Sequence, residues 1–186
     1  MVDLCPQIPF LLHSFDTLGL SAPLLKSITE MGFETPTDIQ AQAIPLLLEG
    51  DRDFIGLAQT GTGKTAAFGL PLLDHLDTEW DHVQALVLAP TRELGQQIAE
   101  QLEKFAKHKK GLKTVAVYGG ANIATQIAQL KKPCHVVIAT PQEQAIPLLD
   151  GTDFPLALLQ AQPPSLPCWV LMFGWDEPLA LPWDRI

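Results

Sequence analysis

The stretch AQTGTGKT, from Ala58 to Thr65, decides the fold. It follows an apolar run at 53–58 and precedes a segment with helical periodicity, so we predict a strand-to-helix turn. Its two glycines allow a tight turn whose backbone N–H groups form an anion nest. The helix N-terminus adds positive charge, Lys64 would reach the β- and γ-phosphates of a nucleotide, and the Thr65 hydroxyl would bind Mg²⁺. An ordinary glycine-containing turn is the alternative, but strand, loop, Lys-Thr and helix in this order favour a phosphate site.

Two patterns alternate between residues 15 and 141. Strands that alternate with helices indicate βαβ units and a parallel sheet. The strand runs are almost continuously apolar, as in sheets that helices cover on both faces. We therefore predict an α/β fold, a three-layer parallel sheet with flanking helices, with ligands at the carboxyl ends of the strands. The predicted strands are 53–58, 83–90, 113–119 and 135–140, and the predicted helices are 22–31, 38–48, 64–76, 92–107 and 123–131.

The composition fits one packed domain in a reducing compartment. The chain has 186 residues, 47% of them hydrophobic, which suffices for a full core. Its net charge of −9 means that any contact with nucleic acid must be local. The three cysteines lack metal-ligand spacing and do not suggest a disulfide framework. With no signal peptide and no apolar run long enough to span a membrane, we expect a cytoplasmic protein.

Residues 142–186 differ in composition from the part before them. They hold seven of the 16 prolines, three of the four tryptophans and six acidic residues against one basic residue. The stretch QAQPPSLPCW excludes a helix or a central strand, because proline removes a donor and fixes φ. We therefore divide the chain into an N-terminal extension (1–14), an α/β lobe (15–141) and an irregular Pro/Trp-rich tail (142–186).

Upstream of the loop, the stretch GFETPTDIQ runs from Gly32 to Gln40 and allows two interpretations. Thr37 and Gln40 have capping-box spacing, so Gln40 would only cap a helix. Alternatively, the amide of Gln40 would read the donor and acceptor of adenine. Phe15 would stack on a base or belong to the core. Spacing alone does not separate these interpretations.

Taken together, several stretches are specific to one family. GFETPTDIQ, AQTGTGKT, PTRELGQQ, YGG and ATP occur in order at family-like intervals. Over about residues 15–141 the chain resembles the first RecA-like lobe of DEAD-box ATP-dependent RNA helicases. The resemblance implies ATP, Mg²⁺ and RNA as ligands, with Lys64 and Thr65 in catalysis and Thr65 on the metal. It assigns ATP binding to Phe15, Phe33, Thr37, Gln40, Gln59, Thr60, Gly61, Thr62, Gly63, Lys64 and Thr65. It assigns RNA binding to Pro90, Thr91, Arg92, Gly119, Gly120 and Thr140.

Taken singly, two of these assignments have plainer alternatives. Arg92 would be an exposed first-turn arginine, and Gly119 and Gly120 would form a strand-end turn. The basic run KFAKHKK, from Lys104 to Lys110, more simply suits a helix C-terminus than an RNA surface.

After residue 141 the chain departs from the family pattern. Gln142 and Glu143 replace the family's Gly-Arg, and the anion should repel RNA. The chain lacks the Asp-Glu-Ala-Asp and Ser-Ala-Thr motifs and the second lobe. Asp176 and Glu177, after an apolar run, are the nearest substitute for the acidic pair, and an acidic turn is their simpler interpretation. The break suggests a truncated or frame-shifted product, testable in the coding DNA.

Three functions follow from these features. The first is an ATPase lobe of the helicase class, which alone would hydrolyse ATP slowly or not at all and bind RNA weakly. The second is a module that binds nucleotide or RNA without chemistry. The third is a non-functional remnant with open sheet edges, unless residues 168–173 enter the sheet.

Overall fold

The computed structural model describes residues 14–50, 54–119, 122–139 and 172–174. The five predicted helices are confirmed to within two residues at each end, with a short 3₁₀ turn after the fourth. Three of the four predicted strands form, each somewhat shorter than predicted. The elements are η1 (Phe15–Thr17), α1 (Ala22–Glu30), α2 (Asp38–Glu49), α3 (Lys64–His75), β1 (Ala85–Leu88), α4 (Arg92–Phe105), η2 (Ala106–His108), β2 (Thr114–Val117), α5 (Ile123–Leu130), β3 (Val136–Ala139) and β4 (Met172–Gly174).

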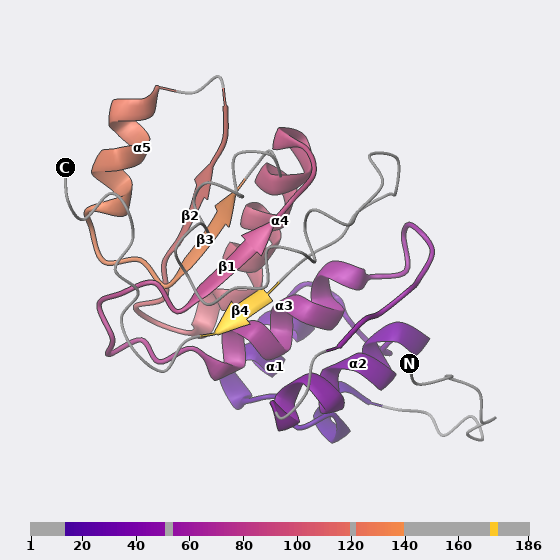
Figure 1. The fold of residues 1–186 in the computed structure, drawn as a ribbon. Coiled ribbons are helices and arrows are strands. Elements are labelled where there is room, and N and C mark those ends of the chain that lie inside the picture. Colours follow the sequence, from indigo (N-terminus) through magenta and orange to yellow (C-terminus); the bar gives the residue numbers. More distant parts are fainter. Residues whose placement is uncertain (1–13, 51–53, 120–121, 140–171, 175–186) are drawn as a thin grey trace.

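The sheet has the order β2-β3-β1-β4 and is parallel over its first three strands (Figure 1). Ala139 at the end of β3 is level with Leu88 of β1 and Val117 of β2. The carboxyl ends of these strands therefore share one edge, which brings the loops after β1 and β2 together. The predicted α/β fold with a parallel sheet and flanking helices is confirmed.

The strand predicted at 53–58 is wrong over its described part, Phe54–Ala58. Phe54–Ala58 carry no strand pairing in the described part of the chain, although Phe54, Ile55 and Leu57 suit a strand. The physical reason is that a strand exists only through its ladder, and no described strand lies against this segment. Without a covering layer, the side chains of Ile55 and Leu57 are 71% and 82% exposed.

A piece of the run 168–173 does enter the sheet. β4 pairs antiparallel with β1, with Met172 opposite Val87 and Gly174 opposite Ala85. Figure 1 shows the β4 arrow beside β1 and pointing the opposite way. The chain therefore leaves β4 at the amino end of β1. The rest of the predicted tail, including Asp176 and Glu177, lies outside the described residues.

The core lies between the helices and the parallel strands. α3 packs against α2 and α4, and α4 packs against β2 and β3, behind the strands in Figure 1. Leu24, Leu70 and Leu102, from α1, α3 and α4, are fully buried. Gly69 lets α3 and α4 approach closely, because a Cβ there would overlap the side chain of Leu102. No helix among the described residues is long and apolar enough to cross a membrane.

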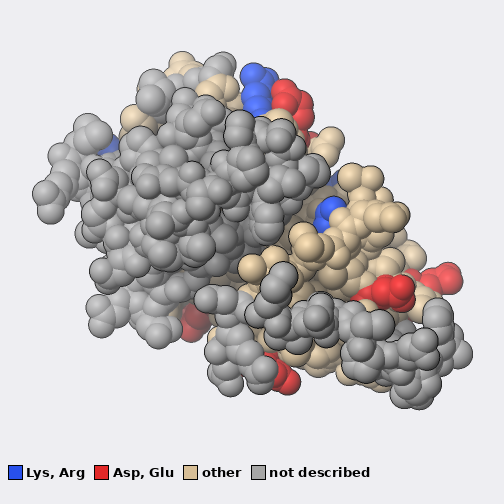
Figure 2. Space-filling model, turned by 45° about the vertical axis from the view of Figure 1, so that its right-hand side comes forward, with Lys and Arg blue, Asp and Glu red and all other residues tan. Residues whose placement is uncertain are grey.

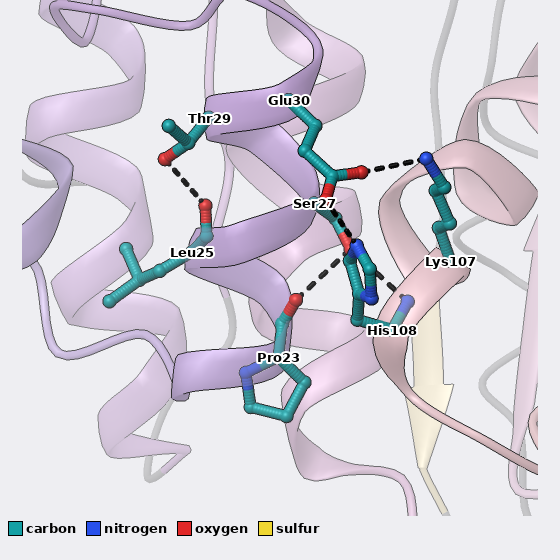
Figure 3. Close-up of polar contacts among 7 residues, drawn as sticks. All are labelled: Pro23, Leu25, Ser27, Thr29, Glu30, Lys107 and His108. Atoms are coloured by element: carbon teal, nitrogen blue, oxygen red, sulfur yellow. Dashed lines mark hydrogen bonds and ion pairs between the residues drawn. The ribbon is translucent and has the colours of Figure 1, made fainter.

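The basic run ties helices together (Figure 3). Glu30 of α1 accepts hydrogen bonds from Lys107 at 2.7 Å and from His108 at 2.9 Å. The backbone N–H of His108 also donates to Ser27 Oγ, which in turn donates to the Pro23 carbonyl. The bonds from Lys107 and His108 lower the pKa of Glu30 to about 2. Part of the run thus fastens α1 to η2.

Lys109, in the same basic run, forms hydrogen bonds with the C-terminal end of α3. Its ammonium group donates to the carbonyls of Leu73 and Asp74 in the last turn of α3. Cations suit a helix C-terminus, where unpaired carbonyls gather. Burial lowers the pKa of Lys109, while Asp74 and Asp77 act in the opposite direction. These contacts agree with a structural role for the run.

Candidate nucleotide and RNA sites

The phosphate loop ends at the N-terminus of α3. Gly61 and Gly63 have φ values of 81° and 80°, in the left-handed region that favours glycine. Gly63 is the N-cap of α3, and the first turn of α3 contains no acidic residue. The positive end of the helix dipole is therefore not neutralised from within the helix, and it suits an anion.

Gln40 joins α2 to this loop. Its Oε1 accepts from the backbone N–H of Thr37 at 2.9 Å, which confirms the capping interpretation. Its Nε2 donates to the Gly63 carbonyl at 3.1 Å, a contact that spacing did not predict. The side chain is buried, with 3% exposure. A single amide therefore caps α2 and holds the phosphate loop against it.

Short polar contacts close the loop on itself. The Thr37 hydroxyl donates to the Thr62 carbonyl at 2.8 Å, and the Thr62 hydroxyl donates to the Gln59 carbonyl at 2.8 Å. The ammonium group of Lys64 donates to the Ala58 carbonyl at 2.7 Å. In this conformation the Ala58 carbonyl engages one of the three donor hydrogens of Lys64.

The other predicted nucleotide residues divide between surface and core. Gln59 and Thr60 are exposed, and Thr65 is half-buried at the second position of α3. Phe15 is only 4% exposed and meets Phe33 edge to face at 5.8 Å between ring centroids. In this arrangement Phe15 supports the segment from the core, as its plainer interpretation expected, and its role in nucleotide binding stays a prediction.

A second group of predicted residues lies where β1 and β2 end. Pro90 and Thr91, between β1 and α4, and Arg92, the first residue of α4, are exposed. The Thr91 hydroxyl caps α4 by accepting from the Leu94 N–H at 3.3 Å. The guanidinium carbon of Arg92 lies over the ring of Tyr118, 5.1 Å from its centroid. Gly119, exposed, follows Tyr118.

Tyr118 and Gln126 were not predicted from the sequence. The Tyr118 N–H donates to Gln126 Oε1 at 2.9 Å, and Gln126 Nε2 donates to the Tyr118 carbonyl at 3.1 Å. Gln126 lies on α5 and is 9% exposed. The available signal was the stretch YGG itself, in which only the glycines were assigned a role.

Four predicted residues lie outside the described part of the chain: Gly120, Thr140, Asp176 and Glu177. Their roles stay predictions. Within the described ranges, His, Cys, Asp and Glu side chains form no group of three or more that could hold a metal ion.

Known proteins of one family match this chain. The profile of the DEAD/DEAH box helicase family matches residues 37–155. The DEAD-box ATP-dependent RNA helicase CshA of Bacillus cereus is 55% identical over 128 residues, which are 69% of this chain and 24% of that protein. This chain thus spans about a quarter of the length of that curated relative.

Solved structures agree with the sequence match. A DEAD box protein from the hyperthermophile Methanococcus jannaschii superimposes with a TM-score of 0.68 at 37% identity, over 77% of this chain and 39% of that one. The structure of S. cerevisiae Dbp5 bound to RNA and ADP BeF3 superimposes with a TM-score of 0.63 at 35% identity, over 74% of this chain and 34% of that one. The fold, the ordered motifs and these matches agree: the chain belongs to the DEAD/DEAH box helicase family.

Proposed function

We propose that this chain is the ATP-binding lobe of an ATP-dependent RNA helicase, which binds ATP with Mg²⁺ and contacts the RNA backbone. The observation that carries the proposal is the phosphate loop at the N-terminus of α3, held by Gln40 and Thr37 of α2. The relative CshA is named an ATP-dependent RNA helicase, and Dbp5 was solved with RNA and ADP BeF3. We further propose that residues 15–141 form the lobe, between the segments 1–14 and 142–186, in a cytoplasmic protein.

The loop would receive the phosphates of ATP. The backbone N–H groups of Lys64 and Thr65 lie at the start of α3, where helical N–H groups have no partner within the helix. The ammonium group of Lys64 would exchange the Ala58 carbonyl for a phosphate oxygen, a stronger charge-assisted bond. Gln59, Thr60 and Thr62 would line the same loop. This exchange couples binding of the phosphate to opening of the loop.

The base would be read next to α2. The Gln40 amide has two donor hydrogens and two acceptor lone pairs, and its bonds to Gly63 and Thr37 use one of each. The remaining donor and acceptor match N7 and N6 of adenine. Phe15 and Phe33 would support this segment from the core. Gln40 would therefore connect recognition of adenine to the position of the loop.

Mg²⁺ fits the hydroxyl of Thr65 together with the phosphates and water. With Thr65 as its protein ligand, the ion would supply neutralisation of the charge on the phosphates of ATP. Hard cations of this kind are usually held by one or two protein oxygens plus substrate phosphates. The described residues offer no competing carboxylate cage. Lys64 and Thr65, the proposed catalytic residues, would bind and orient the phosphates.

The RNA backbone would lie at the shared carboxyl edge of β1 and β2. Thr91 and Arg92 at the start of α4 and Gly119 after β2 face this edge from two loops, and Pro90, Gly120 and Thr140 belong to the same proposal. Over the described part of the face in Figure 2, basic side chains occur as separate spots. With a net charge of −9, RNA binding must therefore depend on a few placed contacts.

Binding of a fluorescent ATP analogue with Mg²⁺ tests the nucleotide site. The Lys64→Ala variant should raise Kd about 10-fold or more, because a charge-assisted bond to phosphate contributes ~1.5–3 kcal/mol. Lys26→Ala, at an exposed position of α1, is the matched control and should leave Kd unchanged. Equal affinities of both variants and the wild type would remove the phosphate loop from the proposal. Gln40→Ala should additionally reduce the preference for ATP over GTP.

A further inference from the structure

We propose that Tyr118 is a positioning residue, held by Gln126, that fixes the guanidinium of Arg92 for an RNA phosphate. The proposal rests on the RNA contact of the proposed function and deepens it. It adds two residues to that site, and the two have different roles. Gln126 fixes the backbone of Tyr118, and Tyr118 fixes the side chain of Arg92.

The backbone of Tyr118 is fixed from α5. Tyr118 directly follows β2, whose outer edge has no neighbouring strand in the described sheet. Gln126 supplies a hydrogen-bond partner from a side chain, since its amide accepts from the Tyr118 N–H at 2.9 Å and donates to the Tyr118 carbonyl at 3.1 Å. A buried amide is costly unless both of its ends are bonded, and here both are. The backbone that carries the ring of Tyr118 is therefore fixed in position.

The ring of Tyr118 in turn holds Arg92. The guanidinium carbon lies 5.1 Å from the ring centroid, within the range of a cation–π contact. Within the described ranges, the guanidinium makes neither a hydrogen bond nor an ion pair. An aromatic ring engages the face of a guanidinium and leaves the N–H groups in its plane for a bidentate contact with phosphate.

Fixing Arg92 in advance should raise affinity for phosphate. A free arginine side chain loses rotamer entropy when it is ordered. A side chain held over an aromatic ring has already given up part of this entropy before the ligand arrives, which is the general advantage of preorganisation. An exposed cation–π contact of about 0.5–1 kcal/mol corresponds to roughly a 2- to 5-fold effect on Kd.

The first experiment needs no RNA. The chain has only three arginines, Arg52, Arg92 and Arg185, so their side-chain Nε–Hε signals can be resolved by NMR, and Arg92→Lys identifies the signal of Arg92. The ring current of Tyr118 should shift this signal upfield. Tyr118→Leu should abolish the shift, and Tyr118→Phe, which keeps the ring face, should retain it. A signal that does not respond to Tyr118→Leu overturns the proposal.

The second experiment measures binding of a short single-stranded oligouridine, with Mg²⁺ and a non-hydrolysable ATP analogue. Arg92→Ala should weaken binding and reduce the salt slope by about 0.7, the value for one lost phosphate contact on a single strand. Tyr118→Leu should weaken binding about 2- to 5-fold, and Tyr118→Phe should stay within about 2-fold of the wild type. Gln126→Leu should resemble Tyr118→Leu, with thermal unfolding measured in parallel.

Combining the variants separates positioning from other roles. In the Arg92→Ala background, Tyr118→Leu should have no further effect, because Tyr118 acts through Arg92. An equal loss in both backgrounds would mean that Tyr118 contacts RNA itself or only stabilises the fold, and would overturn the proposal. If Arg92→Ala leaves binding unchanged, the RNA contact of the proposed function fails and the positioning role fails with it. Loss of binding in Arg92→Ala without loss in Tyr118→Leu overturns the positioning role alone.

Discussion

Replacing Gly63 with alanine should separate the phosphate loop from α2. Two costs add at this position. The backbone has φ of 80°, where a non-glycine residue costs about 1 kcal/mol. The new Cβ would also overlap Gln40 Nε2 and displace the amide. Gln40 would then lose its bonds to the Gly63 carbonyl and to the Thr37 N–H, worth about 1 kcal/mol each. We expect a total loss of about 3 kcal/mol.

Gly61 provides a matched control two residues earlier. Its φ of 81° is almost the same, but nothing lies within 4 Å of a Cβ built there. Gly61→Ala should therefore cost only the backbone strain of about 1 kcal/mol. Urea unfolding followed by far-UV circular dichroism measures both losses. Gln40→Ala removes the side chain that the new Cβ would overlap. The stability loss of the double variant Gly63→Ala with Gln40→Ala should therefore be smaller than the sum of the losses of the two single variants. Equal losses for Gly61→Ala and Gly63→Ala would refute the role assigned to Gln40.

Three further predictions concern pH and association. Burial lowers the pKa of His135 below its usual 6.5, so the stability that its neutral form contributes is complete above pH 6.5 and decreases as pH falls. His135→Gln should therefore flatten the pH dependence of urea-unfolding stability below pH 6.5. The pKa of Glu30 is lowered to about 2, so its contribution to the stability of the fold is present above pH 4.5 and is lost as pH falls through about 2. Glu30→Gln should therefore reduce the slope of the unfolding temperature against pH in that window. An unchanged slope would contradict the ion pair with Lys107. Ile55→Thr with Leu57→Thr should reduce concentration-dependent association in light scattering, since these side chains are 71% and 82% exposed; unchanged association would exclude this segment as its cause.

The helices could be predicted from sequence because their signals are local. Capping residues and apolar periodicity lie within each segment: Thr91 caps α4, and Gly50 ends α2 in the left-handed region. The strands β1, β2 and β3 were found for the same reason, as short apolar runs between turns. Their order in the sheet was not predictable from local pattern, since it depends on pairing between residues far apart in the chain.

The candidate site was predictable only in part. The identities of Gln40, Gly63 and Lys64 follow from motif spacing, but their contacts do not. Gln40 reaches across 23 positions to the Gly63 carbonyl, and no local pattern encodes such a contact. Tyr118, at the end of β2, and Gln126, on α5, form two hydrogen bonds with each other. These bonds exist only because α5 packs against β2. Roles that depend on a single side chain were therefore easier to infer than roles shared by two.

The segment before the phosphate loop shows why a correct local pattern can still give a wrong prediction. Phe54, Ile55 and Leu57 have strand propensity, yet β propensity chiefly expresses packing against neighbours on a sheet. The described sheet ends at β4, and β4 runs antiparallel to β1, against the direction that a crossover connection would give it. In the described sheet, no neighbouring strand pairs with the segment 54–58. The loop itself is formed without such a neighbour, because Gln40 and Thr37 hold it from α2. Gln40 and Thr37 of α2 thus hold the phosphate loop although the segment 54–58 before it forms no strand, which is why Gly63, and not that segment, is the decisive position to test.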